Sequence, residues 1–221
     1  MLVKERKDNY WALNWLDQFM IGHKGFICGG CFKNIFNKEK VKDLDIFFKS
    51  KSDFEEAVSY YNSNEEYKFS YENANVKAYV HKKTDVRIEL CCKIFGKAED
   101  ILNQFDFTIT KFAYYKEEVE DETGAEFVSP FDNETIEVPL KSTHIEYKVL
   151  IHDKFFEHLH MKRLVTDDKI LFPMSTFERI IRYAKYGYFP CKETKMKIAR
   201  EINNLSKEQL EVSEVLYDGM D

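Results

Sequence analysis

The sequence predicts an α+β fold in which a mixed α/β sheet domain is followed by a small, all-helical region. Short apolar segments typical of strands alternate with amphipathic segments typical of helices over the first part of the chain. Helix signals dominate the remainder. Apolar residues make up 44% of the chain and aromatic residues 15%, which is enough for a sizeable packed core. We therefore expect a sheet domain at residues 1–140 and a helical region at residues 141–221.

Overall charge and the N-terminal segment restrict the class of protein. The net charge is −6, whereas a protein that binds nucleic acid is more often basic, so contact with RNA or DNA would need local basic patches. No apolar run is long enough to span a bilayer, and the first residues lack the apolar core of a signal peptide. Five cysteines without a secretion signal predict reduced thiols. We therefore expect a cytoplasmic protein that does not contact a membrane.

Strands and helices alternate in the first half of the chain. The expected elements are, in order, a helix at residues 8–20, a strand at 25–28, a helix at 31–37, a strand at 44–48 and a helix at 53–62. The strand "GFIC" is short and apolar and is followed by Gly29 and Gly30, which predict a tight turn. Ser52 or Asp53 is the expected N-cap of the last helix.

The second half begins with further strands and ends in helices. The expected elements are strands at residues 67–71, 76–81 and 85–91, a helix at 97–104, a strand at 105–115, and helices at 174–186, 191–204 and 206–219. Ser175 and Glu178 form a possible capping box, and Gly187 is a possible C-terminal stop. Ser206 is the expected N-cap of the final helix.

Two pairs of chemically active residues lie close together in "GFICGGCFKNIFNKEKVKDLDIFF", residues 25–48. Cys28 and Cys31 form half of a zinc-type pattern, but the adjacent Cys91 and Cys92 make a poor second half, so we expect the cysteines to pack as small buried hydrophobes. The four histidines of the second half have no comparable metal spacing, and we expect them to be surface or packing residues: His144, His152, His158 and His160.

The paired aspartates are the stronger candidates for chemistry. Asp43 and Asp45 are two residues apart on a predicted strand, so their side chains share one face and could hold a divalent metal through oxygen. Gly29 and Gly30 would expose backbone N–H groups and permit close approach of phosphate, and Lys33 could add a cation. These ingredients predict an enzyme that uses a nucleoside triphosphate.

Three segments resemble motifs of the polymerase-β-like nucleotidyltransferases, in the branch that contains bacterial poly(A) polymerases and tRNA CCA-adding enzymes. "GGCFKN…KDLDIFF" resembles the G-G-x-V-R-D…D-x-D signature. "FDFTITKFAY" (105–114) resembles R-R-D-F-T-I-N-A-x-A-Y, and "ERIIRYAKYGY" (178–188) resembles the R-x-x-R-F-A neck helix. The matches occur in the order of the family, and the spacing also resembles compact relatives encoded by phages. The resemblance implies a nucleotidyltransferase head at 1–140 and a helical neck region at 141–221.

The chain also departs from the motifs of this family. Gln104 and Phe105 stand where the second motif has two arginines, and the region 172–176 lacks the base-reading E-D-x-x-R stretch. The long helical body of the full-length enzymes is not matched either. Nucleotide preference and the acceptor are therefore left open.

The resemblance implies a set of site residues and a two-metal mechanism. Asp43 and Asp45, joined by Glu89 or Asp106 as the third carboxylate, would bind Mg²⁺. The triphosphate of an NTP, expected to be ATP, would be held by the glycine turn and by three cations: Lys33, Arg179 and Arg182. An acceptor hydroxyl, for example an RNA 3′ end, would then attack the α-phosphate and pyrophosphate would leave. The alternatives are transfer to a protein or small molecule, and a catalytically silent module that binds nucleotide or a partner.

Overall fold

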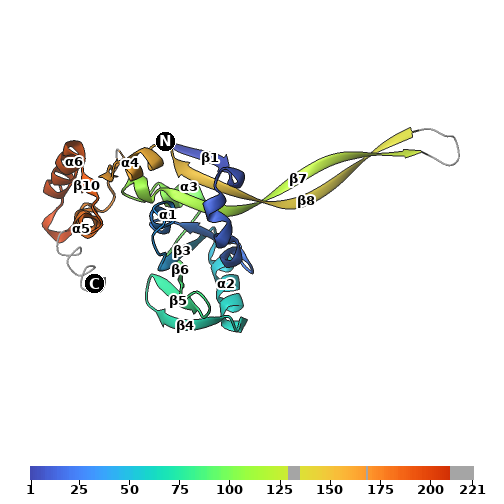
Figure 1. Ribbon diagram of the computed structural model, residues 1–221, viewed down its shortest axis with the longest axis horizontal. Helices are drawn as coiled ribbons and strands as arrows, with labels where there is room; N and C mark the ends of the chain where they lie inside the picture. The colour runs from blue at the N-terminus through green and yellow to red at the C-terminus, as the bar shows by residue number, and fades with distance from the viewer. Residues whose placement is uncertain (129–134, 168, 210–221) are drawn as a thin grey trace.

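The computed structural model describes residues 1–128, 135–167 and 169–209, and its main feature is one eight-stranded sheet (Figure 1). The strand order is β1-β8-β7-β2-β3-β6-β5-β4. The strands are β1 (Leu2–Arg6), β2 (Phe26–Cys28), β3 (Asp43–Phe48), β4 (Tyr67–Glu72), β5 (Val76–His81), β6 (Arg87–Phe95), β7 (Phe112–Val128) and β8 (Thr135–His152). A second, two-stranded sheet joins β9 (Arg163–Leu164) to β10 (Phe189–Pro190). The predicted mixed α+β fold class is confirmed.

Helices connect these strands and cover the sheet. The α-helices are α1 (Cys31–Phe36), α2 (Lys51–Ser63), α3 (Ala98–Leu102), α4 (Phe155–His160), α5 (Pro173–Ala184) and α6 (Lys192–Asn203). Residues 8–20 were expected to form an amphipathic helix. They form two 3₁₀ segments, Lys7–Asn9 and Trp11–Met20, whose apolar side chains face the core. Among the described residues, no helix is both long and apolar enough to cross a membrane.

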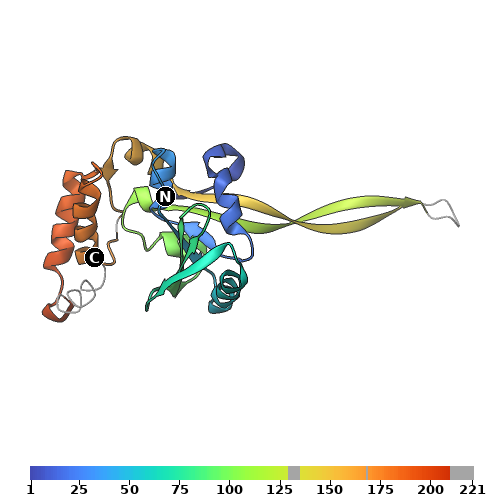
Figure 2. The same ribbon diagram turned by 60° about the horizontal axis from the view of Figure 1, so that its bottom comes forward.

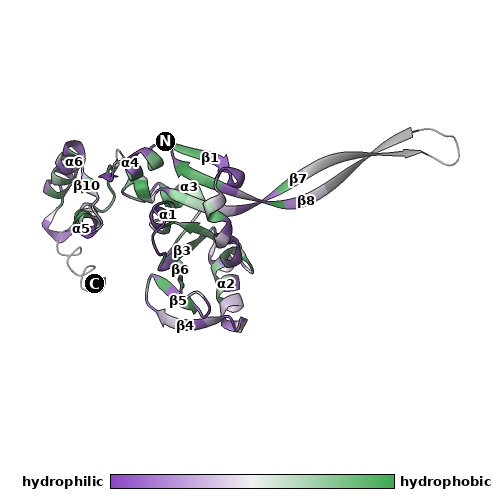
Figure 3. Ribbon diagram, viewed as in Figure 1, coloured by the Kyte–Doolittle hydropathy of each residue, from purple (hydrophilic) through white to green (hydrophobic). Residues whose placement is uncertain are grey.

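Two apolar layers hold the sheet, one on each face. The larger contains the inward side chains of the central strands, among them Leu44, Ile46 and Ile88, and packs them against the Trp11–Met20 segment, α1 and α2. The smaller lies under α3 and includes Phe26 and Cys28. Hydrophobic stretches accordingly run along the central strands (Figure 3). Because side chains alternate along a strand, Asp43 and Asp45 lie on the face of the smaller layer, where Asp43 is exposed and Asp45 is partly buried.

Strands β7 and β8 form a hairpin that projects far beyond the sheet (Figures 1 and 2). Only the ends of these strands near residues 112–116 and 148–152 also pair with β2 or β1, whereas Glu117 to Val128 pair with β8 alone. The strand expected at residues 105–115 therefore begins later, at Phe112, after a short 3₁₀ turn at Thr108–Thr110.

Several predicted helix boundaries are shifted by local capping. Ser50, and neither Ser52 nor Asp53, is the N-cap of α2, because its side chain accepts a hydrogen bond from the Asp53 N–H at 3.2 Å. Helix α5 begins at Pro173 without a side-chain cap, so the capping box expected at Ser175 does not form. The Ser206 hydroxyl does accept a hydrogen bond from the Gln209 N–H, as expected. The helix expected at 206–219 otherwise lies outside the described residues.

The helices α5 and α6 lie beside one another at one end of the molecule, opposite the projecting hairpin (Figure 2). The expected domain boundary at residue 140 falls within β8, which belongs to the large sheet. Division of the chain into a head and a helical neck stays a prediction.

Candidate active site

Three carboxylates meet where β3 and β6 lie side by side. The two strands are parallel neighbours, and their register pairs Asp45 with Glu89 and Asp43 with Arg87. Directly paired residues on neighbouring strands project from the same face of a sheet. The register thus places Asp43, Asp45 and Glu89 on one face of the sheet, and their role as metal ligands stays a prediction.

The Asp45 carboxyl group lies in an environment that disfavours its negative charge. Burial, together with the neighbouring charges of Glu89 and Asp43, raises the pKa of this carboxyl group from 3.8 to about 7, against a smaller opposing effect of Arg179. In the part of the chain that the structure describes, no hydrogen bond or ion pair to the Asp45 carboxylate is found. Such a carboxylate would gain stability from a nearby cation.

Arg87 and Tyr71 border the carboxylates and were not predicted. The Arg87 Nη1 lies 3.4 Å from Asp43 Oδ1 and 3.7 Å from Glu89 Oε1. Its guanidinium group also lies over the Tyr71 ring, 5.7 Å from the centroid, and the Tyr71 hydroxyl donates a hydrogen bond of 2.8 Å to Glu89. The spacing of Arg87 two residues before Glu89 on a strand was the available sequence signal for the arginine, whereas Tyr71 comes from β4 and had none.

The glycine turn lies between Asp45 and helix α5. Gly29 has φ +96°, a left-handed conformation that side chains rarely adopt, and a Cβ placed on it would be 3.4 Å from Asp45 Oδ2. A Cβ on Gly30 would be 3.5 Å from the Tyr183 hydroxyl. Both glycines therefore border the carboxylates, where the absence of side chains leaves the backbone accessible to a ligand.

Asp106 joins helix α5 to the sheet at this site. Its Oδ1 accepts a hydrogen bond from the Phe107 N–H at 2.9 Å, and its Oδ2 accepts one from Arg179 Nη1 at 3.1 Å. The Asp106 side chain is almost fully buried, at 7% exposure. The arginine also reaches Asp45 electrostatically, as noted above. Arg182 is exposed one turn further along α5, and its charge acts on the Tyr183 hydroxyl.

Lys33 points to a different set of partners. Its ammonium group is buried, forms an ion pair with Glu39 at 3.0 Å, and lies over the rings of Tyr186 and Tyr188 at 5.1 and 5.7 Å. This position satisfies the charge of Lys33 locally. A role of Lys33 in phosphate binding stays a prediction.

The donor atoms at the site suit a hard cation. Among the described residues, no three side chains of His, Cys, Asp or Glu are already arranged as a metal cluster. The donors that share this face are the carboxylate oxygens of Asp43, Asp45 and Glu89, the type of ligand that Mg²⁺ prefers, and no cation of the described residues contacts Asp45. The thiols of Cys28, Cys31 and Cys91 are free, and burial raises the pKa of each, so they remain protonated and are poor metal ligands. The residues present therefore fit a divalent metal held by carboxylates.

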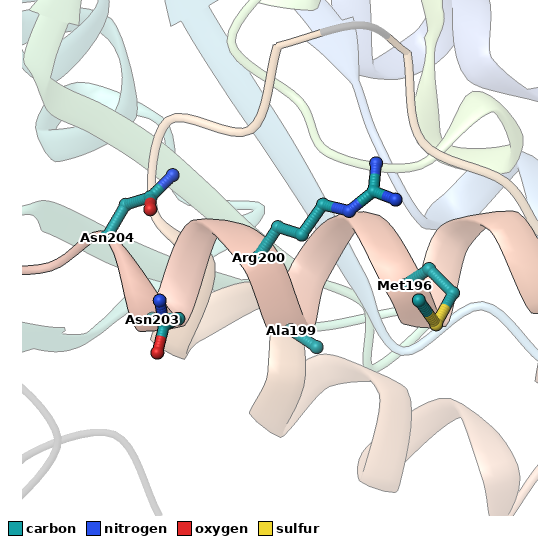
Figure 4. A pocket seen from close by; sticks show the side chains of 5 residues that line it. All are labelled: Met196, Ala199, Arg200, Asn203 and Asn204. Atoms are coloured by element: carbon teal, nitrogen blue, oxygen red, sulfur yellow. The ribbon is translucent and has the colours of Figure 1, made fainter.

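A shallow pocket elsewhere on the surface does not coincide with this site. It lies along α6 and is lined by Met196, Ala199, Arg200, Asn203 and Asn204 (Figure 4). None of these residues is among the predicted site residues.

The fold is similar to that of solved tRNA-processing enzymes. One is a CCA-adding enzyme in complex with ATP, which is 14% identical with a TM-score of 0.57, over 96% of this chain and 50% of that one. Another is the Thermotoga maritima CCA-adding enzyme complexed with tRNA, at 13% identity and TM-score 0.53, over 90% of this chain and 46% of that one. The chain thus spans about half the length of these structures. At such low identity the similarity demonstrates a shared nucleotidyltransferase-like fold.

Sequence comparison places the chain in a protein family. A search of curated proteins finds no match. The model of the Gabija anti-defense 2 family matches residues 5–162, which include all strands of the large sheet except the start of β1, together with the three carboxylates and the glycine turn. That match covers well over half of the chain, and the chain therefore belongs to the Gabija anti-defense 2 family.

Proposed function

We propose that this protein is a divalent-metal-dependent nucleotidyltransferase, which transfers a nucleoside monophosphate from an NTP to an acceptor hydroxyl. The observation that carries the proposal is the placement of Asp43, Asp45 and Glu89 on adjacent strands beside the glycine turn. A half-buried carboxylate with a pKa of about 7, which no cation of the described residues contacts, is costly to the fold, and this is typical of a binding site for a metal.

Each group at the site has a defined role in this reaction. Asp43, Asp45 and Glu89 would hold Mg²⁺, which when bound activates an attacking oxygen and neutralises phosphate charge. The backbone at Gly29 and Gly30 would accommodate the triphosphate. The Arg179 guanidinium group, which Asp106 orients through a 3.1 Å hydrogen bond, would face the phosphates together with Arg182.

The acceptor is proposed from the fold and the family. The similar solved structures contain ATP in one case and tRNA in another, and on that basis we propose ATP as donor and an RNA 3′ end as the first acceptor to test. Transfer to a protein or small molecule is the alternative. The description of the family further leads us to propose that the modification counters Gabija defence.

The decisive experiment measures nucleotide binding and transfer together. Calorimetry with each NTP, with and without Mg²⁺, is compared between the wild type and the Asp43→Asn, Asp45→Asn double variant. Incubation with α-³²P-labelled NTP and either RNA or protein then identifies the acceptor by where the label appears. We expect metal-dependent binding and label transfer that the double variant lacks. Full activity in the double variant would refute the proposed mechanism.

A catalytically silent nucleotide-binding module is the second candidate. Arg87 favours it, since this arginine pairs with Asp43 and Glu89 and so competes with a metal for both carboxylates. Arg87→Gln removes the competing charge while keeping a polar side chain. Nucleotide binding without label transfer, in both the wild type and Arg87→Gln, would support the silent module over the enzyme.

A further inference from the structure

The Tyr183 hydroxyl is a polar group at the site that has no assigned partner. The side chain comes from α5, directly after Arg182 and four residues after Arg179. Its ring packs edge-on against Phe107 and Tyr188, with centroids 5.9 and 6.2 Å away. These two contacts, from different elements, fix the direction of the ring. The hydroxyl oxygen consequently points to the glycine turn, 3.5 Å from the position that a Cβ on Gly30 would take.

This hydroxyl is a hydrogen-bond donor at neutral pH. Burial and the negative charges of Asp106 and Asp45 raise its pKa above the ordinary tyrosine value, while Arg179 and Arg182 oppose the shift. The proton therefore stays on the oxygen. Within the described residues no hydrogen bond of this hydroxyl is found, and it is not among the polar atoms enclosed without a partner. The hydroxyl is thus available to a ligand at the turn.

We propose that Tyr183 binds the substrate by donating a hydrogen bond from its hydroxyl to a phosphate oxygen of the NTP triphosphate. The proposal rests on the proposed nucleotidyltransferase function. Two features point to a phosphate at this position: Gly30 lacks a side chain where the hydroxyl points, and Arg179 and Arg182 supply positive charge on the same helix. A protonated tyrosine whose hydroxyl feels the positive charge of two arginines is suited to an anion that accepts several hydrogen bonds.

The residue is also a departure from the motif that the helix resembles. The R-x-x-R-F-A pattern has phenylalanine where this chain has Tyr183. The aromatic ring is common to both, whereas the hydroxyl is particular to this chain. Tyr183→Phe therefore removes one oxygen atom and keeps the packing against Phe107.

The test measures affinity for Mg²⁺–ATP, inorganic tripolyphosphate and AMP by calorimetry, in the wild type and in Tyr183→Phe. A hydrogen bond to a charged group contributes enough that its loss should weaken ATP and tripolyphosphate binding about tenfold or more. AMP, which lacks the β- and γ-phosphates, should bind both proteins equally. The matched control is Tyr115→Phe, which removes a partly buried hydroxyl on β7 and should leave all three affinities unchanged.

The outcomes separate this inference from the proposed function. Equal binding of ATP and tripolyphosphate by the wild type and Tyr183→Phe would overturn the role of the hydroxyl and leave the proposed function standing. Failure of the wild type to bind any NTP would overturn both. Thermal unfolding without ligand checks that Tyr183→Phe is folded, and an unchanged midpoint with weaker triphosphate binding would establish the contact.

Discussion

Asp45→Asn should stabilise the metal-free protein while it abolishes metal-dependent nucleotide binding. In the fold, burial and two neighbouring carboxylates raise the pKa of Asp45 from 3.8 to about 7. Above pH 7 the folded protein must therefore hold a charge that water would solvate better. Replacement by the neutral, nearly isosteric asparagine removes that charge and keeps the shape of the side chain.

The expected gain follows from proton linkage. A pKa change of one unit corresponds to about 1.4 kcal/mol of free energy. The rise in the pKa of Asp45 from 3.8 to about 7 therefore limits the stability gained by Asp45→Asn to about 4 kcal/mol. Because Asp45 is only partly buried, solvent screening reduces this to about 2 kcal/mol. Between pH 4 and 7 the folded state binds a proton that the unfolded state has lost, so wild-type stability from this group falls as pH rises and is constant above pH 7.

Urea unfolding in EDTA at pH 5 and pH 8 measures the effect. The advantage of Asp45→Asn should be larger at pH 8 than at pH 5, and addition of Mg²⁺–ATP should stabilise the wild type alone. Asp43→Asn is the matched control, because the Asp43 side chain is 46% exposed and, among the described residues, forms an ion pair with Arg87 alone. Its replacement should change stability by less than about 1 kcal/mol. A wild type as stable as Asp45→Asn at pH 8 would refute the reasoning.

Two further predictions concern the glycine turn and a buried histidine. Gly29→Ala should destabilise the fold by about 1–2 kcal/mol, because Gly29 has a φ of +96°, which a residue with a side chain adopts only at a cost. Gly30 has φ −68° and ψ −20°, so Gly30→Ala should leave the thermal midpoint unchanged. It should nevertheless weaken NTP binding, because the added methyl group fills the space before the Tyr183 hydroxyl. Burial lowers the pKa of His23 from 6.5 to about 4, so stability should fall by about 3 kcal/mol as pH drops through that window, and His23→Gln should remove this dependence in urea titrations.

The predictions for the glycine turn and for His23 can each be contradicted by a specific result. Equal midpoints for Gly29→Ala and Gly30→Ala would mean that the turn relaxes without strain. For His23, the neutral ring bonds the Phe19 carbonyl through Nε2 at 2.8 Å and accepts the Gly25 N–H at Nδ1 at 3.0 Å, and protonation would break the second bond. A pH profile of His23→Gln parallel to that of the wild type would show that another group is responsible.

Local rules predicted the part of the site that lies along single strands. The alternation of side chains on "LDIFF" was sufficient to place Asp43 and Asp45 on one face, and the Gly-Gly pair was sufficient to predict a turn after β2. These features depend on neighbours in the sequence, which is why they could be read without the fold. Helix starts were less accurate, because Ser50 and Pro173 compete with other plausible caps nearby.

The sequence by itself determined the fold class, the order of most elements and the identity of the paired aspartates, since each depends on hydrophobic periodicity or on residues adjacent in the chain. Only the tertiary structure decided how Arg87, Tyr71 and Tyr183 surround the carboxylates, and that Lys33 is held by Glu39. The reason is physical: the contacts around the carboxylates join β3, β4, β6 and α5, which are far apart in sequence, and the Lys33–Glu39 pair depends on how the chain turns after α1. Their packing leaves no periodic signal along the chain.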